Sequence, residues 1–160
     1  MKKFLSILLI ALLCLSLAVG CAAQKGILGN ARWDMTKEEL IKAEGAEHIV
    51  TGASENVLNW EKNKAFKEFG DHAVRIGYVF SSENKLSSIT VQVLVNEGET
   101  VADAMKSTRA AMEEAYGKSE GSDTNCHWHL ENGTITLTPL KGADACFIVN
   151  FSRATAEHQH

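Results

Sequence analysis

The chain has 160 residues, of which 45% are hydrophobic and 22% are charged, with a formal net charge of −4 and a single proline. This composition excludes a disordered or collagen-like chain and leaves room for one ordinary hydrophobic core. The isoelectric point near 5.9 argues against a nucleic-acid-binding protein, which needs a basic face. We therefore expect one globular domain and no nucleic-acid partner.

The first twenty residues have the pattern of an export signal. Lys2 and Lys3 are followed by an uncharged stretch, 4–20, that consists mostly of Leu, Ile and Ala. A basic start before a short apolar run is typical of a secretory signal peptide, and this run is too short for an ordinary membrane span. We expect residues 1–20 to be removed on export.

The end of this segment resembles the lipobox of bacterial lipoproteins. Cys21 follows the run Leu17-Ala18-Val19-Gly20, which places a small residue before the expected cleavage site. The resemblance implies that the Cys21 thiol is acylated, so that membrane lipid is a partner of the protein. Two or three acyl chains hold a protein firmly at a membrane. The expected location is the cell envelope, on the outer face of the cell membrane or in an outer membrane.

The rest of the chain has a simple expected organisation. Residues 21–30 comprise the lipidated cysteine and a tether, residues 31–152 form a single domain, and residues 153–160 form a polar tail. Within the domain, residues 31–96 and 97–152 have the same predicted order of elements and are interpreted as two pseudo-repeats.

Capping signals predict two helices. The first begins at the capping box that starts with Thr36 and ends at Gly45. The second begins at Thr100, continues with apolar residues at helical spacing, and ends at Gly117.

Three strand-like runs follow each predicted helix. They are rich in apolar residues, in part alternating with polar ones, and they span 57–61, 73–80 and 85–95, then 126–131, 134–138 and 145–151. We therefore expect a two-layer α+β fold with an antiparallel sheet of about six strands and both helices on one face.

The alternation of the last three strands assigns their two faces. Asn132-Gly133 is a strong hairpin signal, and a two-residue turn there pairs Leu130 with Ile135. A three-residue loop at 141–143 continues the sheet. The predicted inner face comprises Trp128, Leu130, Ile135, Leu137, Phe147, Val149 and Phe151. The predicted outer face comprises His127, His129, Thr134, Thr136, Thr138, Cys146, Ile148 and Asn150. Two helices cannot cover both faces of such a sheet, so we expect the outer face to be an open binding surface, although any two-layer α+β domain has such a face.

Cys126 and Cys146 are the only cysteines after Cys21. An exported pair favours a disulfide. The predicted register, however, places the two on opposite faces and two strand spacings apart, about 10 Å, which exceeds the usual reach of a disulfide. A bulge or a frayed strand end would allow the bond, so both alternatives stay open.

His127 and His129 are candidate metal ligands. They are two residues apart on one predicted strand, so both imidazoles point to the same face. A metal site needs a third and usually a fourth ligand, and Glu131 shares their face. The simpler interpretation is a pair of exposed histidines on a polar face, and we expect no cofactor.

A wider resemblance covers most of residues 31–152. The run Trp33-Asp34-Met35-Thr36-Lys37-Glu38-Glu39-Leu40, followed by strands with Tyr78-Val79-Phe80 and Lys85-Leu86, resembles small lipoproteins of outer-membrane assembly (BamE, also called SmpA or OmlA). The doubled helix-plus-three-strand unit is similar to the β-lactamase inhibitor protein fold. Asp34 and Gly45-Ala46-Glu47 depart from the family pattern. The resemblance implies a fold and a scaffolding or inhibitor-like action, and no site residue.

The sequence contains no arrangement of nucleophile, base and orienting group, and no phosphate-binding loop. We therefore expect a membrane-anchored extracytoplasmic lipoprotein that is not an enzyme and acts as a protein-binding or scaffolding module with a partner in the cell envelope. One alternative is an inhibitor of an exported hydrolase. Another is a metal-binding protein that uses His127 and His129.

Overall fold

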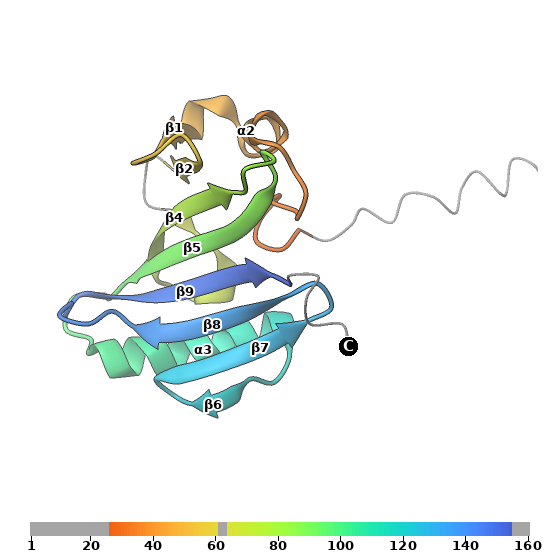
Figure 1. The fold of residues 1–160 in the computed structure, drawn as a ribbon. Helices are drawn as coiled ribbons and strands as arrows, with labels where there is room; N and C mark the ends of the chain where they lie inside the picture. The colour runs from red at the N-terminus through yellow and green to blue at the C-terminus, as the bar shows by residue number, and fades with distance from the viewer. Residues whose placement is uncertain (1–25, 61–63, 155–160) are drawn as a thin grey trace, which may run out of the picture.

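The computed structural model describes residues 26–60 and 64–154, which form an α+β fold with one antiparallel sheet and two α-helices (Figure 1). The helices are α2 (Lys37–Glu44) and α3 (Val101–Tyr116), and two 3-10 turns are η1 (Ala46–His48) and η2 (Lys67–Phe69). The strands are β1 (Ile49–Thr51), β2 (Val57–Trp60), β3 (Lys64–Ala65), β4 (Ala73–Phe80), β5 (Leu86–Leu94), β6 (Glu120–Ser122), β7 (Asn125–Leu130), β8 (Gly133–Pro139) and β9 (Cys146–Arg153).

The strands lie in the order β1-β2-β4-β5-β9-β8-β7-β6, and β3 pairs with β4 beside β2. Strands β5 and β9 pair over seven residues, from Ser88 opposite Ser152 to Leu94 opposite Cys146. This pairing joins the strands that precede α3 to those that follow it. The predicted number of about six strands was too low, because β1, β3 and β6 have only two or three residues each and therefore no readable alternation.

Both helices begin and end at the predicted capping residues. The hydroxyl of Thr36 accepts a hydrogen bond from the Glu39 N–H, and the Glu39 carboxylate accepts one from the Thr36 N–H. The hydroxyl of Thr100 accepts from the Asp103 N–H at the start of α3. Each helix ends at a glycine with positive φ. These contacts are local in sequence, so the local sequence sufficed to predict them.

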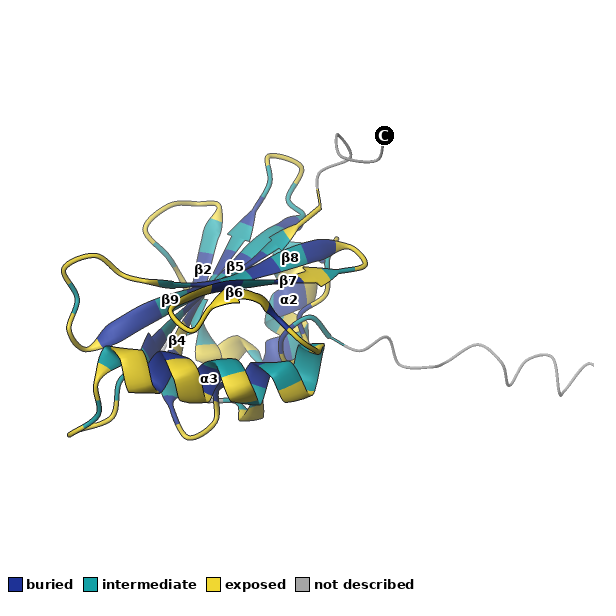
Figure 2. Ribbon diagram, turned by 90° about the horizontal axis from the view of Figure 1, so that it is seen from below, coloured by how far each residue is buried: buried dark blue, intermediate teal, exposed yellow. Residues whose placement is uncertain are grey.

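One face of the sheet is apolar and packs on both helices. Tyr116 at the end of α3 contacts the Phe151 ring edge to face, and Lys37 of α2 lies over the Phe80 ring. Figure 2 shows both helices on the same side of the sheet. The predicted inner face is confirmed. Leu130 is half-buried, and the other six residues predicted for this face are each at most 1% exposed: Trp128, Ile135, Leu137, Phe147, Val149 and Phe151.

The partners across the β7–β8 hairpin differ from the prediction. The turn consists of Glu131 and Asn132, so Leu130 lies opposite Gly133 rather than Ile135. Gly133 belongs to β8, where a Cβ atom would lie only 2.3 Å from the Ser152 carbonyl oxygen of β9. The glycine therefore serves the close approach of two strands and not the turn.

The β8–β9 connection is also longer than predicted. Residues 140–145 form it, with a turn closed by a hydrogen bond from the Ala143 N–H to the Leu140 carbonyl oxygen. As a result, Leu137 lies opposite Val149 rather than Phe147. Each register change moves a partner by two residues. Side-chain direction repeats every two residues, so the faces stay as predicted although the partners change.

The domain begins earlier than expected. Residues 27–30, assigned to the tether in the sequence, pack against the fold. Leu28 is 1% exposed, and the Tyr116 hydroxyl donates a hydrogen bond of 2.8 Å to the Ile27 carbonyl oxygen. At the other end, Arg153 belongs to β9 rather than to a polar tail, and it forms an ion pair of 2.7 Å with Asp34.

The assignment of faces is tested by two neighbouring substitutions in β9. Phe147→Ala should lower the free energy of unfolding by about 3–5 kcal/mol, because Phe147 is fully buried and its truncation leaves a cavity. Ile148→Ala, on the opposite and half-buried face, should cost about 1–2 kcal/mol. Urea unfolding measures both values, and an equal or larger loss from Ile148→Ala would contradict the two-sided sheet.

Candidate functional site

The face of the sheet opposite the helices carries mostly polar side chains together with Val79, Leu94 and Ile148, and no helix of the described residues covers it (Figure 2). We call it the open face. Its central row crosses seven strands, since each member is paired with the next: Asn59, Gly77, Thr90, Asn150, Thr136, His127 and Glu120. A second row on the same face contains Ser88, Ser152, Thr134 and His129.

Hydrogen bonds order the centre of the open face. The Thr90 hydroxyl donates to the Asn150 side-chain carbonyl at 3.2 Å, and the Asn150 amide donates to the Ser152 hydroxyl at 2.8 Å. Gly77 contributes no side chain to the row, and the Asn59 side-chain oxygen lies beside it, 3.2 Å from where a Cβ atom of residue 77 would be. The result is a low surface of hydroxyl and amide groups that can donate and accept hydrogen bonds.

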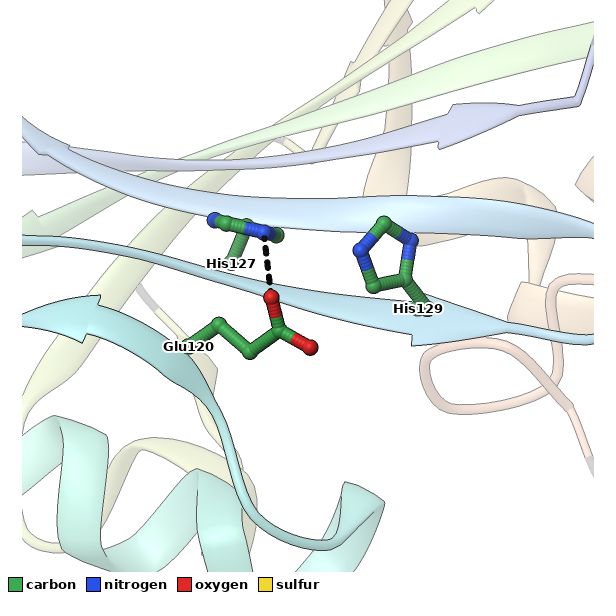
Figure 3. Close-up of side chains that lie close together, drawn as sticks. All are labelled: Glu120, His127 and His129. Carbon is green, nitrogen blue, oxygen red and sulfur yellow. Dashed lines mark ion pairs between the residues drawn. The ribbon is translucent and has the colours of Figure 1, made fainter.

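The edge of the open face holds a cluster of three possible metal ligands, which we call the edge cluster. It consists of Glu120 from β6 and of His127 and His129 from β7 (Figure 3). The side-chain ligand atoms all lie within 4.8 Å of one another. His127 Nε2 lies 3.4 Å from Glu120 Oε2, and the two imidazole rings have centroids 5.1 Å apart and planes at 85°.

The pairing of β6 with β7 places Glu120 opposite His127, and it depends on a glycine in β6. Gly121 has a φ of +105°, and a Cβ atom there would lie 2.4 Å from the Asn125 carbonyl oxygen. A residue with a side chain would therefore displace β6. On the adjacent strand, the Trp128 indole N–H donates a hydrogen bond of 2.8 Å to the Gly117 carbonyl oxygen, which ties β7 to the end of α3.

A polar network secures the chain that enters β6. The Glu113 carboxylate of α3 accepts hydrogen bonds from the Ser119 hydroxyl at 2.6 Å and the Ser119 N–H at 3.2 Å. Arg109 donates to the Ser119 hydroxyl at 2.7 Å, and it pairs with Glu113 and Asp123. The two hydrogen bonds from Ser119, together with the Arg109 guanidinium, hold the pKa of Glu113 below its usual range. Ser119 immediately precedes Glu120, so this network also positions the edge cluster.

The two described cysteines lie on opposite faces of the sheet and are free thiols. Cys126 is opposite Leu137 on the apolar face, and burial raises the pKa of its thiol, with the Arg109 charge acting in the opposite direction. Cys146 lies on the open face, where its sulfur accepts a hydrogen bond of 3.0 Å from the Gln92 amide. Strand β8 separates their two strands.

The sequence identified two members of the edge cluster and missed the third. His127 and His129 share a face because they are two residues apart on β7. Glu131, the expected third ligand, lies in the β7–β8 turn and is not a member. Glu120 was missed because β6 is a fully exposed three-residue strand. The glycine at 121, just before a polar turn, was the available signal for a tight reversal there.

A second surface feature lies beside α2. It is a shallow groove of about 510 Å³ lined by Arg32, Trp33, Asp34, Met35, Glu39, Lys42 and Ala43. Both charge signs and one half-buried indole contribute to it. The groove is remote in sequence from the edge cluster, and Asp34 in its wall is already paired with Arg153.

None of the described helices is both long and apolar enough to cross a membrane. Cys21 and the export segment lie outside the described residues. No family model matches the chain, and neither a curated protein nor a solved structure does.

The hydrogen bonds between Ser119 and Glu113 predict that the stability of the fold depends on pH. Because the pKa of Glu113 is lower in the folded state than in the unfolded chain, its ionised form stabilises the fold above the unfolded value of about 4.3. That stability should be lost as the pH falls through the folded pKa. Glu113→Gln should therefore lower the free energy of unfolding at pH 7. The difference in this free energy between the variant and the parent should become smaller below about pH 4.

Urea unfolding between pH 3 and pH 8 measures this difference. Glu114→Gln, at the exposed neighbouring position of α3, is the control and should change stability less at pH 7. A Glu113→Gln deficit that is the same at pH 3 and pH 7 would show that the ionised carboxylate does not stabilise the fold.

Proposed function

We propose that the protein is a lipoprotein of the cell envelope, anchored through acylated Cys21, and that its open face binds another protein without catalysing a reaction. The observation that carries this proposal is the two-sided sheet. Both helices pack on the apolar face, and a row that is polar at every position except Gly77 crosses seven strands on the other. Such a surface offers many hydrogen-bonding groups over a broad area, and a typical protein interface contains about ten direct hydrogen bonds.

The short distance between the anchor and the fold supports this arrangement. Only residues 22–25 separate Cys21 from the first described residue, Gly26. An extended chain of this length spans at most about 18 Å. The acylated protein would therefore stay close to the membrane surface, where its partner would be another envelope protein rather than a nucleic acid.

The finer architecture belongs to the same proposal. We infer that residues 31–96 and 97–152 are structural repeats of a helix-plus-three-strand unit, as the likeness to assembly lipoproteins and to the β-lactamase inhibitor protein fold implies. The strand order supports this inference, since β2-β4-β5 and β7-β8-β9 meet through their last strands, β5 and β9. An inhibitor of an exported hydrolase would use the same surface.

The open face can be tested by site-specific photo-crosslinking in intact cells. A photoreactive residue replacing Thr136, at the centre of the open face, should give a crosslinked species of one discrete mass. The same residue replacing Lys106, exposed on α3, is the control and should not give that species. Mass spectrometry of the species then gives its composition.

A charge at the centre of the face should disrupt the same complex. Thr90→Arg adds a cation between Gly77 and Asn150, on the same face as the cation of Arg75, and an unpaired charge in an interface costs several kcal/mol. The crosslinked species from position 136 should therefore fall at least tenfold, with little change in the unfolding midpoint. Equal crosslinking from positions 136 and 106 would argue against the open face as the binding surface.

The anchor has a separate test. Cys21→Ser removes the thiol that would be acylated, so the protein should leave the membrane fraction and appear in a soluble fraction. Cys14→Ser is the matched control, because Leu13 precedes Cys14 and the lipobox pattern is absent there. Membrane retention of the Cys21→Ser variant, measured by fractionation and immunoblotting, would contradict lipid anchoring.

A further inference from the structure

We propose that Glu120, His127 and His129 bind one divalent transition-metal ion of the zinc class at the β6 edge of the open face. This site goes beyond the proposed function, since it requires neither a protein partner nor the lipid anchor.

The distances within the edge cluster fit a single ion. In a tetrahedral site with bonds of about 2.0–2.1 Å, neighbouring ligand atoms are about 3.3 Å apart. His127 Nε2 and Glu120 Oε2 are 3.4 Å apart, so one edge of that tetrahedron is already formed. All ligand atoms lie within 4.8 Å, and side-chain rotation alone can close the remaining difference.

The side chains are free to make this rotation. The side chain of His127 is 42% exposed and that of Glu120 is 70% exposed. His129 is also exposed, and all three project from the same side of the sheet (Figure 3). On β8, the cross-strand neighbours of the histidines are Thr136 and Thr134, whose short side chains leave room above the strand.

The backbone under the cluster is held on both sides. Strand β7 pairs with β6 and with β8, so the spacing between His127 and His129 is fixed. Gly121 of β6 allows the close pairing that places Glu120 opposite His127, and the Ser119 network fixes the chain just before it. A ligand set carried by secured strands loses little entropy when it binds an ion.

The donor atoms indicate the class of metal. Two imidazole nitrogens and one carboxylate form a common set for zinc that leaves a fourth position for water. Imidazole suits Zn²⁺, Cu²⁺, Ni²⁺ and Co²⁺, whereas Ca²⁺ and Mg²⁺ require a shell of oxygen ligands. The site should therefore take Zn²⁺ and discriminate against Ca²⁺ and Mg²⁺.

The chain contains a matched control for this geometry. His48 Nε2 lies 3.4 Å from Glu47 Oε1, which equals the His127–Glu120 distance. Within the described residues, this pair is not part of a group of three ligands. A histidine–glutamate pair alone should bind Zn²⁺ far more weakly than the edge cluster.

The experiment titrates Zn²⁺ into the full protein, purified in detergent without a histidine tag. His158 and His160 are replaced by Ala in every sample, so that these histidines of the sequence cannot contribute. Calorimetry should find one ion per chain, and Zn²⁺ should raise the unfolding midpoint because binding favours the folded state. Ca²⁺ and Mg²⁺ should do neither.

Single variants assign the ligands. His127→Ala and His129→Ala should each weaken Zn²⁺ binding at least tenfold and abolish the rise in the unfolding midpoint, while Glu120→Gln should weaken binding to a lesser degree. His48→Ala should leave both values unchanged. Circular dichroism of each variant without metal checks that it is folded, and His127→Gln, which keeps a polar side chain, replaces His127→Ala if that variant is not.

Three results would overturn the site: no binding by the parent, unchanged affinity in the His127 and His129 variants, or an equal loss in His48→Ala. Each of these leaves the crosslinking at position 136 unaffected, so a failure of the metal site and a failure of the protein-binding surface can be told apart.

Discussion

The pairing of β5 with β9 is the contact on which the rest of the structure depends. It joins strands separated by more than fifty residues into one sheet, with Val91 opposite Val149 on one face and Thr90 opposite Asn150 on the other. Side chains alternate between the faces, so a slip by one residue would expose the apolar side chains and bury the polar ones. Burial of the apolar side therefore selects the register and, with it, the composition of the open face.

The two helices determine which face remains open. Each helix contains only a few buried residues. They are Leu40 and Glu44 in α2 and Ala104, Met105, Thr108 and Met112 in α3. Their apolar sides can therefore cover one side of the sheet and not two. The hydroxyl and amide groups of the other side keep their contact with water, which is why a chain with an ordinary core presents such a broad polar surface.

The edge of the sheet combines structural and chemical roles. An unpaired edge strand invites association with other chains, and a short strand that carries a charge discourages it. Strand β6 has three exposed residues and begins with Glu120. The Arg109, Glu113 and Ser119 contacts attach the chain just before it to α3, so the backbone of Glu120 has a defined position beside His127 although it lies at the rim of the domain.

The sequence by itself determined the features that depend on near neighbours. Thr36, Gly45, Thr100 and Gly117 specify the helix ends, because capping bonds span only a few residues, and alternation assigned Trp128 and His127 to opposite faces. The tertiary structure decided which residues face one another. Gly133 is part of β8 because the Ser152 backbone approaches it, and Glu120 joins His127 because α3 secures a strand too short to show a pattern. Such contacts join distant segments, and no local propensity encodes them.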